Sequence, residues 1–207
     1  MDPRFKHPFT CVLAGPSGSG KTTFVLKLIS NINSLIIPIP NEIIYCYSEW
    51  QPVYTELKEK WNITFCEGLP NTDDFEPSHQ QLVIIDDLMN DIDDRVTRLF
   101  TRESHHRGIS VIHISQNLFS KHKEQRTINL NTHYIVLFKN PRDVSQLTHL
   151  ARQMYPGKTG FMKEAYKLST LEPFGYLLID LKQDTPDHMR LRTNIFSETN
   201  QIVFLPK

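Results

Sequence analysis

The sequence contains few cysteines and no long hydrophobic run. Its 207 residues include three cysteines, which are widely spaced and form no CxxC pair: Cys11, Cys46 and Cys66. An odd number of isolated cysteines favours buried free thiols in a reducing compartment over a disulfide framework. No apolar stretch approaches the ~20 residues of a membrane-spanning helix, and the amino terminus lacks the apolar segment and cleavage site of a signal peptide. We therefore expect an intracellular, non-secreted protein without a membrane partner.

The sequence also lacks an excess of charge of one sign, an internal repeat and a Gly/Ser-rich linker. Lysine and arginine together number 23, and so do aspartate and glutamate, so the net charge gives no indication of a nucleic-acid partner. A hydrophobic content of 39% with 22% charged residues is typical of a globular chain. A chain of this length can bury a core without disulfide or metal staples, and we expect one domain, residues 1–207.

What the sequence does contain is a series of short apolar runs that alternate with polar or helical stretches. These runs are the predicted strands: Phe9–Ala14, Glu42–Tyr47, Ile63–Cys66, Leu82–Ile85, Ser110–Ile114, His133–Phe138 and Tyr176–Ile179. Several are apolar almost throughout, as expected of parallel strands covered on both faces. Apolar residues at helical spacing predict helices at Thr22–Ile32, Asp91–Phe100 and Val144–Met154. The alternation predicts an α/β fold, a central and mostly parallel sheet between helical layers. Two strand-like pieces in Met189–Lys207 predict a short C-terminal β extension, either at the sheet edge or as a hairpin.

The first predicted strand runs directly into GPSGSGKT, residues 15–22, which matches the phosphate-binding pattern GxxxxGK(S/T). The expected nucleotide-binding residues are Gly15, Pro16, Ser17, Gly18, Ser19, Gly20, Lys21, Thr22 and Thr23. The glycines let the backbone curl so that its N–H groups point at phosphate oxygens, and the following helix adds its amino-terminal dipole. We expect Lys21 to reach the β- and γ-phosphates and the Thr22 hydroxyl to ligate Mg²⁺. A chance turn is disfavoured, because a strand precedes the loop and a helix follows it.

Two aspartates follow the predicted strand Leu82–Ile85. Magnesium in a phosphate-loop site needs a carboxylate from a neighbouring strand, and Asp86 is the expected partner of the metal. Asp87 stands where hydrolytic enzymes of this class usually carry a glutamate that orients and deprotonates the attacking water. Its shorter side chain can do so only where the backbone lies closer. The alternative is that the pair merely ends a strand and caps a helix.

A polar pair, Gln116 and Asn117, ends the next apolar strand. An amide at this position can hydrogen-bond the γ-phosphate or the attacking water and report hydrolysis to the rest of the chain. Gln116 is our first choice and Asn117 the second. The alternative is that these amides cap a turn, a common role for amides at strand ends.

In chain order, the loop GPSGSGKT, the strand LVIIDD and the segment RGISVIHISQN resemble the RecA-like, additional-strand branch of P-loop NTPases. A glutamine that ends the strand after the acidic one is characteristic of the FtsK–HerA group of DNA-pumping motors. The segments NTHYIVLFKNPRD, LARQMYP and YLLIDLKQDTPDHMRLRTNIF extend the likeness. The chain is similar to genome-packaging ATPases of large double-stranded DNA viruses, the poxvirus packaging ATPase group, and of Polinton (Maverick) and adintovirus elements. The resemblance covers nearly the whole chain, from Phe9 to Phe196.

This resemblance implies an ATP-hydrolysing homo-oligomeric ring, expected to be a hexamer, that threads double-stranded DNA into a capsid without reading its sequence. It implies ATP and Mg²⁺ as ligands, capsid proteins as further partners, and a place in the host nucleus or cytoplasm, or in the virion. By the same likeness, Lys21 and Thr22 bind nucleotide and metal, and Asp86 holds Mg²⁺. Asp87 then stands at the catalytic acid position, and Gln116 is the sensor.

A ring motor of this kind also needs an arginine supplied by the neighbouring subunit, which can speed hydrolysis by ~10³-fold or more. Arg107, just before the sensor strand, is the first candidate, and Arg102 and Arg142 follow it. An isolated arginine is more often a surface charge. The aspartate in place of the usual glutamate at position 87 leaves the rate of hydrolysis open, but it does not affect the expectation of nucleotide binding.

Two other functions stay open on the residues alone. The first is a P-loop kinase of a nucleotide or small metabolite, which should offer an arginine-rich lid; the sequence shows no clear lid, although Arg190 and Arg192 could be misread as one. The second is a nucleotide-dependent switch or scaffold that has lost motor activity, although the intact phosphate loop argues against decay. The absence of a guanine-reading NKxD element favours ATP over GTP.

Three further features have a functional and a simpler interpretation. The basic segment Lys121–Arg126 could touch DNA phosphates in a ring pore, but a solvated loop is simpler. The aromatic residues Trp50, Tyr54 and Trp61 could stack on a base, although packing in the core is the preferred interpretation. His105 and His106 are adjacent and could suggest a metal site. No cysteine or third histidine lies at the spacing that zinc requires, so a zinc site is disfavoured.

Overall fold

The computed structural model describes residues 2–69, 80–86, 88, 94–119, 123–197 and 199–206. In this part of the chain, nine strands form one sheet in the order β11-β10-β9-β8-β2-β7-β6-β4-β5. The strands from β8 to β5 run parallel to one another, and β9, β10 and β11 continue the sheet in antiparallel fashion. Their bounds are β2 Thr10–Ala14, β4 Glu42–Tyr47, β5 Ile63–Glu67, β6 Gln81–Asp86, β7 Ile109–Ser115, β8 Tyr134–Phe138, β9 Tyr176–Asp180, β10 Leu191–Thr193 and β11 Ile202–Val203.

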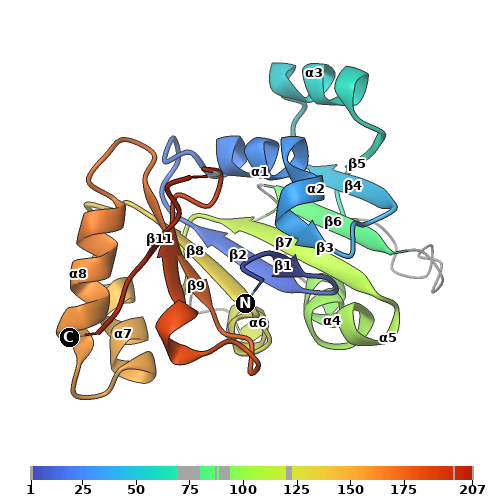
Figure 1. Ribbon diagram of the computed structural model, residues 1–207. Helices are drawn as coiled ribbons and strands as arrows, with labels where there is room; N and C mark the ends of the chain where they lie inside the picture. The colour runs from blue at the N-terminus through green and yellow to red at the C-terminus, as the bar shows by residue number, and fades with distance from the viewer. Residues whose placement is uncertain are drawn as a thin grey trace.

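Helices cover both faces of this sheet, so the fold has three layers (Figure 1). One face carries α1 Lys21–Ser30, α2 Ile32–Leu35 and α3 Pro52–Lys60, beside a small parallel pair of strands, β1 Phe5–Lys6 and β3 Ile36–Ile37. The other face carries α4 Asp94–Arg98, the π-helical turn η3 Leu99–Glu103, α5 Ser104–His106, α6 Lys123–Leu130, α7 Ser145–Met154 and α8 Thr159–Ser169. A short 3₁₀ turn, η4 Asp187–Met189, precedes β10.

The central strand β2 shows why both faces must be covered. Every residue of β2 is buried. Its side chains alternate, so that Cys11 and Leu13 belong to the core under α1, while Val12 and Ala14 belong to the core under α7 and α8. A strand that is apolar on both faces gains stability only between two helical layers, because successive side chains point to opposite sides. The prediction of a mostly parallel, doubly covered sheet is confirmed.

The order of the strands places functional loops side by side. β7 lies between β2 and β6 and pairs with both in parallel register. The insertion of one strand between the phosphate-loop strand and the acidic strand is the arrangement expected of the RecA-like branch. Because parallel strands end at the same edge of a sheet, the carboxyl ends of β2, β6 and β7 meet at one edge. This edge is where the candidate site lies.

The predicted elements agree with the structure at most strands and differ at the helices. All seven predicted strands are present, and the C-terminal pieces form an antiparallel hairpin, β10 with β11, that also extends the sheet edge. The predicted helix Thr22–Ile32 is divided, because α1 ends at Ser30 and α2 begins at Ile32. The predicted helix Asp91–Phe100 begins outside the described residues and continues beyond Phe100 as η3 and α5.

The three cysteines are free, as predicted. Cys11 and Cys46 are buried in central strands, whereas Cys66 is only half-buried because β5 is an edge strand. Burial raises the pKa of the Cys11 and Cys46 thiols far above the usual range, so both stay protonated. In the described part of the chain, no helix combines the length and apolar character that crossing a bilayer requires.

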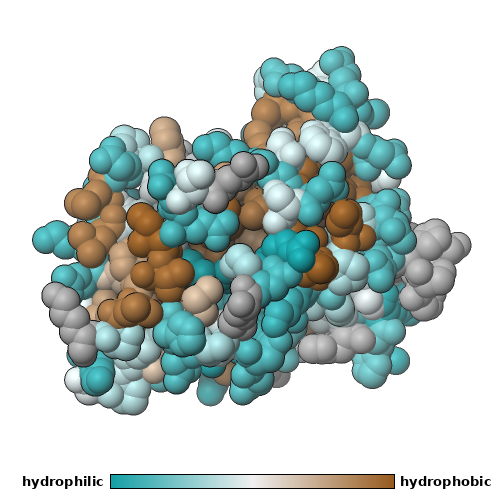
Figure 2. Space-filling view, in the orientation of Figure 1, coloured by the Kyte–Doolittle hydropathy of each residue, from teal (hydrophilic) through white to brown (hydrophobic). Residues whose placement is uncertain are grey.

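One surface of the molecule is notably apolar. Side chains coloured as hydrophobic gather over β11 and α8 (Figure 2), where Leu168, Ile202 and Leu205 are exposed. Phe161, Leu168 and Leu205 also line a hollow between α8 and the C-terminal segment. Contiguous exposed apolar surface of this kind marks places where proteins contact partners. We refer to Leu168, Ile202 and Leu205 as the apolar surface.

His113 is a buried histidine in the middle of β7. It is fully buried, and among the described residues neither ring nitrogen has a hydrogen-bond partner. Its ring lies 6.4 Å from the ring of Phe100, centroid to centroid. Burial lowers the pKa of His113 to about 4, because an uncompensated imidazolium in the core is unfavourable. The folded state therefore keeps this histidine neutral at pH values where an exposed histidine is charged.

This burial predicts a pH-dependent stability. Between pH 6.5 and about pH 4, the unfolded chain binds a proton at position 113 that the folded chain does not bind, so the free energy of unfolding falls as the pH falls. The loss attributable to this residue is on the order of 3 kcal/mol across that window. Urea unfolding of His113→Leu at several pH values should give a flatter profile than that of the native chain. His188→Gln, at an exposed histidine, is the control, and equal slopes for His113→Leu and the native chain would refute the prediction.

Candidate functional site

The loop after β2 has the backbone shape of a phosphate-binding loop. Gly18 and Gly20 adopt left-handed conformations, with φ of 74° and 100°. A Cβ atom at Gly15 would lie 2.7 Å from Cβ of Phe138 and 2.8 Å from Oγ of Ser19, so a side chain does not fit there. The Gly15 N–H donates to the Ser115 carbonyl over 3.2 Å and thereby ties the loop to the end of β7. The predicted loop is present, and its glycines are needed where the backbone turns or packs closely.

Lys21 begins α1 and folds back into the loop. Its Nζ donates to the carbonyl of Gly15 over 2.6 Å and to the carbonyl of Pro16 over 2.8 Å. The ammonium group therefore lies inside the curl of the backbone. Helix α1 follows Gly20 with no acidic residue in its first turn, so the positive end of the helix dipole is not neutralised. The loop, the ammonium group and the helix terminus together favour an anion.

Asp86, the last residue of β6, is 4% exposed and accepts three hydroxyl groups on one oxygen. Tyr45 donates to its Oδ2 over 2.6 Å and Tyr54 over 3.1 Å. The Thr22 hydroxyl approaches the same oxygen at 3.5 Å. Burial and the nearby charge of Asp86 raise the pKa of Tyr45 well above its usual value, so its hydroxyl stays protonated and donates. The carboxylate is thus held in one orientation beside the first turn of α1.

Gln116 follows β7 and lies between the loop and Asp86 along the sheet edge. Its side chain is exposed and lines the same cavity as Lys21 and Asp86. Asn117, the second choice from the sequence, has other contacts: its carbonyl oxygen accepts the Ser115 hydroxyl over 2.7 Å, and its Oδ1 accepts from Gln146 Nε2 over 3.1 Å. The structure therefore brings Gln116 to the cavity and ties Asn117 to the turn beside it.

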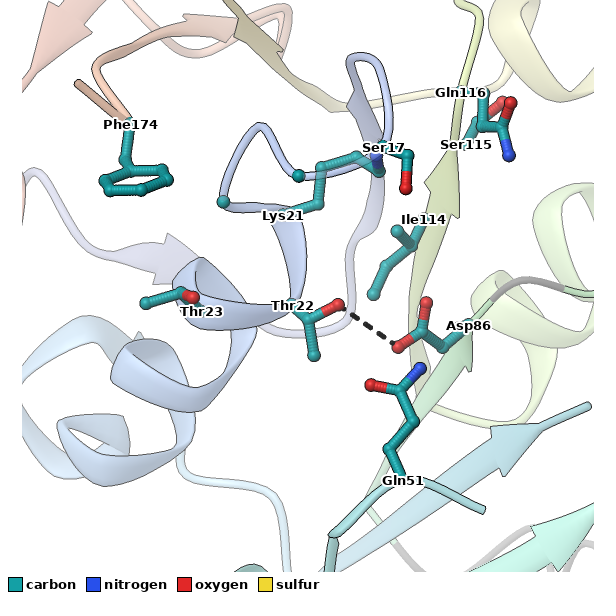
Figure 3. A pocket seen from close by; sticks show the side chains of 12 residues that line it. Ser17, Lys21, Thr22, Thr23, Gln51, Asp86, Ile114, Ser115, Gln116 and Phe174 are labelled. Atoms are coloured by element: carbon teal, nitrogen blue, oxygen red, sulfur yellow. Dashed lines mark hydrogen bonds between the residues drawn. The ribbon is translucent and has the colours of Figure 1, made fainter. Parts of the chain in front are cut away.

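The cavity at this edge has a volume of about 250 Å³. It is lined by the loop and α1 through Ser17, Gly18, Gly20, Lys21, Thr22 and Thr23, by Asp86, by Ile114 and Ser115 at the end of β7, and by Gln116 directly after it. Figure 3 shows Lys21 and Thr22 between Thr23 on one side and Asp86 on the other. Three predicted loop residues support the cavity without lining it: Gly15, Pro16 and Ser19, whose hydroxyl is buried.

Besides Ile114 and Ser115 of β7, four residues of the site were not assigned to it from the sequence. Gln51 and Phe174 line the cavity, and Tyr45 and Tyr54 hold Asp86. In the structure, Tyr45 faces the α1 side of β4 and pairs with Ile84 on β6, two residues before Asp86, a register that the sequence alone does not reveal. The interpretation of Tyr54 as a packing residue is correct for its ring, which lies 4.9 Å from that of Tyr45, but it omits its hydroxyl.

Two sequence predictions cannot be placed at the cavity. Asp87 and part of the basic segment Lys121–Arg126 lie outside the described residues. Arg107 lies before the start of β7, whereas Gln116 follows its end, and seven residues of strand span about 23 Å. Arg107 also pairs with Glu103 over 2.6 Å. It does not reach the cavity of its own chain, and a role in a neighbouring subunit stays a prediction.

The other two candidate arginines lie elsewhere on the surface. Arg102 is exposed on η3, in the helical layer that contains α4. Arg142 is exposed and follows β8, so it lies at the same sheet edge as the phosphate loop, where its N–H donates to Asn140 Oδ1 over 3.1 Å. Of the three predicted arginines, Arg142 is therefore on the edge that carries the cavity.

Solved structures share this fold at low sequence identity. The DNA-packaging ATPase B204 from Sulfolobus Turreted Icosahedral Virus is 13% identical, with a TM-score of 0.56, and the match covers 100% of both chains. EssC (ATPases 2 and 3) from Geobacillus thermodenitrificans is 13% identical with a TM-score of 0.56, over 96% of this chain and 40% of that chain. A KaiC-like protein from Pyrococcus horikoshii OT3 is 11% identical with a TM-score of 0.50, over 97% of this chain and 91% of that chain. These likenesses show the fold.

The sequence itself carries the family relationship. No curated protein matches the chain. The family described as Poxvirus A32 protein matches residues 2–155, which include the phosphate loop, Asp86 and Gln116. The match spans most of the chain and agrees with the resemblance to the poxvirus packaging ATPase group. The chain therefore belongs to the Poxvirus A32 protein family.

Proposed function

We propose that this chain is an ATP-hydrolysing motor that moves double-stranded DNA into a viral capsid. The observation that carries the proposal is the convergence of Lys21, Thr22 and Asp86 on one cavity, with Thr22 Oγ1 3.5 Å from Asp86 Oδ2. The family supports the viral setting, and the similar chain from the icosahedral virus is a DNA-packaging ATPase. The same fold serves several functions, so the site has to carry the argument.

The cavity suits the phosphates of a nucleoside triphosphate. The left-handed turns at Gly18 and Gly20 turn the loop backbone around the Lys21 ammonium group. A triphosphate in this loop would take over the hydrogen bonds that Lys21 now makes with backbone carbonyls, and a phosphate oxygen is the stronger acceptor because it is charged. We assign the predicted residues Gly15 to Thr23 to ATP binding on this basis.

Magnesium fits the oxygen atoms beside the loop. Thr22 contributes a hydroxyl and Asp86 a buried carboxylate, and hard cations such as Mg²⁺ prefer these ligands. When bound, Mg²⁺ would neutralise charge on the β- and γ-phosphates. Thr22 and Asp86 are the proposed metal-binding pair, and Tyr45 and Tyr54 are the residues that position the carboxylate.

The remaining catalytic roles are assigned by position. Gln116 lines the cavity beside Asp86, where its amide can hydrogen-bond the attacking water or the γ-phosphate. Asp87 follows Asp86 directly in the sequence and is proposed to accept the proton of that water as its oxygen attacks the γ-phosphorus and the bond to the β–γ bridging oxygen breaks, which releases ADP. An arginine from the next subunit, with Arg107 as the candidate taken from the sequence, is proposed to stabilise the charge of the transition state.

A ring of identical subunits, most simply a hexamer, completes the proposal. The apolar surface of Leu168, Ile202 and Leu205 supports assembly, because exposed apolar residues favour contact with another subunit. DNA would pass through the ring and be held through its phosphates without sequence readout. Capsid proteins are the proposed further partners. A small-molecule kinase is less well supported. The Gln116 amide, between the loop and the acidic strand, suits a role in orienting water, and a kinase that transfers phosphate to an acceptor does not need it.

Removing the loop lysine tests the central claim. Lys21→Ala should lower phosphate release from ATP by at least about 10²-fold, because a charge that stabilises the transferring phosphate is lost. Lys163→Ala, at an exposed lysine of α8, should leave the rate unchanged. Phosphate release is measured with Mg²⁺ present, with and without double-stranded DNA, and the native chain should be faster with DNA. A native chain that hydrolyses no ATP, or that phosphorylates a nucleotide acceptor without any effect of DNA, would exclude the motor.

The two tyrosines give a second prediction. Tyr45→Phe and Tyr54→Phe each remove one hydroxyl that donates to Asp86, and groups that orient a metal-binding side chain typically contribute 10–100-fold to metal affinity. Each variant should raise the Mg²⁺ concentration needed for half-maximal ATP hydrolysis by about 10-fold. Tyr134→Phe removes a buried hydroxyl that accepts the Lys6 N–H at the opposite sheet edge, and serves as the matched control. Equal magnesium titrations for Tyr45→Phe and Tyr134→Phe would contradict the proposal that Tyr45 positions Asp86.

A further inference from the structure

Phe174 is an exposed aromatic residue in an unusual conformation. It lies in the turn between α8 and β9, and 66% of its surface is exposed. Its φ is 62°, and in the described part of the chain only one other residue besides glycines, Asn194, has a positive φ. A bulky side chain is strained in this left-handed region. Strain of this kind persists where the surrounding structure enforces it, and it is often found at ligand-binding sites.

The turn around Phe174 is tightly held. A Cβ atom at Gly175 would lie 2.5 Å from the Ser169 carbonyl oxygen, so the backbone there packs without room for a side chain. The Gly175 N–H donates to the Glu172 carbonyl over 3.1 Å. At the other end of the turn, Thr170 donates both its N–H and its hydroxyl to the Tyr166 carbonyl, over 3.1 and 2.7 Å. These contacts fix the backbone that carries Phe174 before any ligand binds.

The ring of Phe174 covers one end of the cavity. It lies against Gly20, since a Cβ atom there would be 3.1 Å from Cδ1 of Phe174. In Figure 3, Phe174 and Thr23 lie on one side of Lys21 and Thr22, and Asp86 lies on the other. The γ-phosphate belongs at the end with Asp86 and Gln116, because the proposed metal and water sites are there. A nucleotide that spans the cavity therefore leaves it past Thr23 and Phe174.

We propose that Phe174 stacks on the base of the bound nucleotide. The inference rests on the proposed function, because it extends the same nucleotide site. An exposed, rigidly held phenyl ring beside the exit of a phosphate loop offers a flat apolar face, and base–aromatic stacking contributes about 1–3 kcal/mol per base. A base that covers the ring also removes apolar surface from water. Phe174 thus binds the nucleoside, whereas Lys21 and Thr22 bind the phosphates.

The test separates the base from the phosphates. Binding of a non-hydrolysable ATP analogue and of inorganic triphosphate, both with Mg²⁺, is measured on the full chain. Phe174→Ala should weaken the binding of the analogue by about 5- to 100-fold. It should leave the affinity for inorganic triphosphate unchanged. Phe174→Trp should keep the affinity for the analogue and show fluorescence quenching with the analogue but not with triphosphate. Leu171→Ala removes another exposed apolar side chain of the same turn and should change neither affinity.

Two results would overturn the assignment. One is that Phe174→Ala binds the analogue as tightly as the native chain. The other is that this variant loses affinity for the analogue and for triphosphate equally, which would mean that Phe174 supports the loop rather than the base. Failure of the proposed function gives a different pattern, in which the native chain binds the analogue but hydrolyses no ATP with or without DNA.

Discussion

The buried carboxylate of Asp86 constrains much of the structure around the cavity. A carboxyl group at 4% exposure needs hydrogen-bond partners, since an unpaired polar group in the core is unfavourable. In the described part of the chain, donors reach it from three elements: Tyr45 on β4, Tyr54 on α3 and Thr22 on α1. One oxygen atom therefore links the acidic strand to the phosphate-loop helix and to a helix that carries no part of the loop. A movement that carried Thr22 or Tyr54 away from Asp86 would break one of these hydrogen bonds.

The hydrogen bonds of Asp86 connect the proposed nucleotide site to α3. α3 contacts the sheet through Tyr54 and Leu57, while its remaining residues are exposed or half-buried. Gln51, directly before α3, lines the cavity, and Trp50 packs edge-on against Tyr54 at 5.7 Å between ring centroids. In the proposed motor, Thr22 and Asp86 would hold Mg²⁺ with the same carboxyl group to which the tyrosines donate. Tyr45, Tyr54 and Trp50 thus lie where a change at the proposed metal site would reach α3.

Local sequence patterns predicted the strands, the loop, Asp86 and Gln116, because each depends on neighbours in the chain. Apolar runs such as Leu82–Ile85 need a doubly covered sheet whatever surrounds them, and glycines at fixed spacing indicate a loop. Tyr45 and Tyr54 could not be assigned in this way, since their hydroxyls meet a carboxylate 41 and 32 residues away. Helix α3 was missed because only Tyr54 and Leu57 of it are buried, too few to give a periodic signal. Phe174 depends on a turn whose strain arises from packing between α8 and β9.

The polarity of the sheet restricts the proposed ring. Arg107 lies at the amino end of β7 and the cavity at the carboxyl end, so Arg107 can act on a neighbour only where opposite sheet edges of adjacent subunits face each other. Arg142 follows β8 at the cavity edge. It could act on a neighbour only where the carboxyl edges of adjacent subunits lie side by side. The apolar surface over β11 and α8 lies at the antiparallel end of the sheet, away from β5. In the proposed ring, a contact through this surface would leave the carboxyl ends of β2, β6 and β7 free to bind nucleotide.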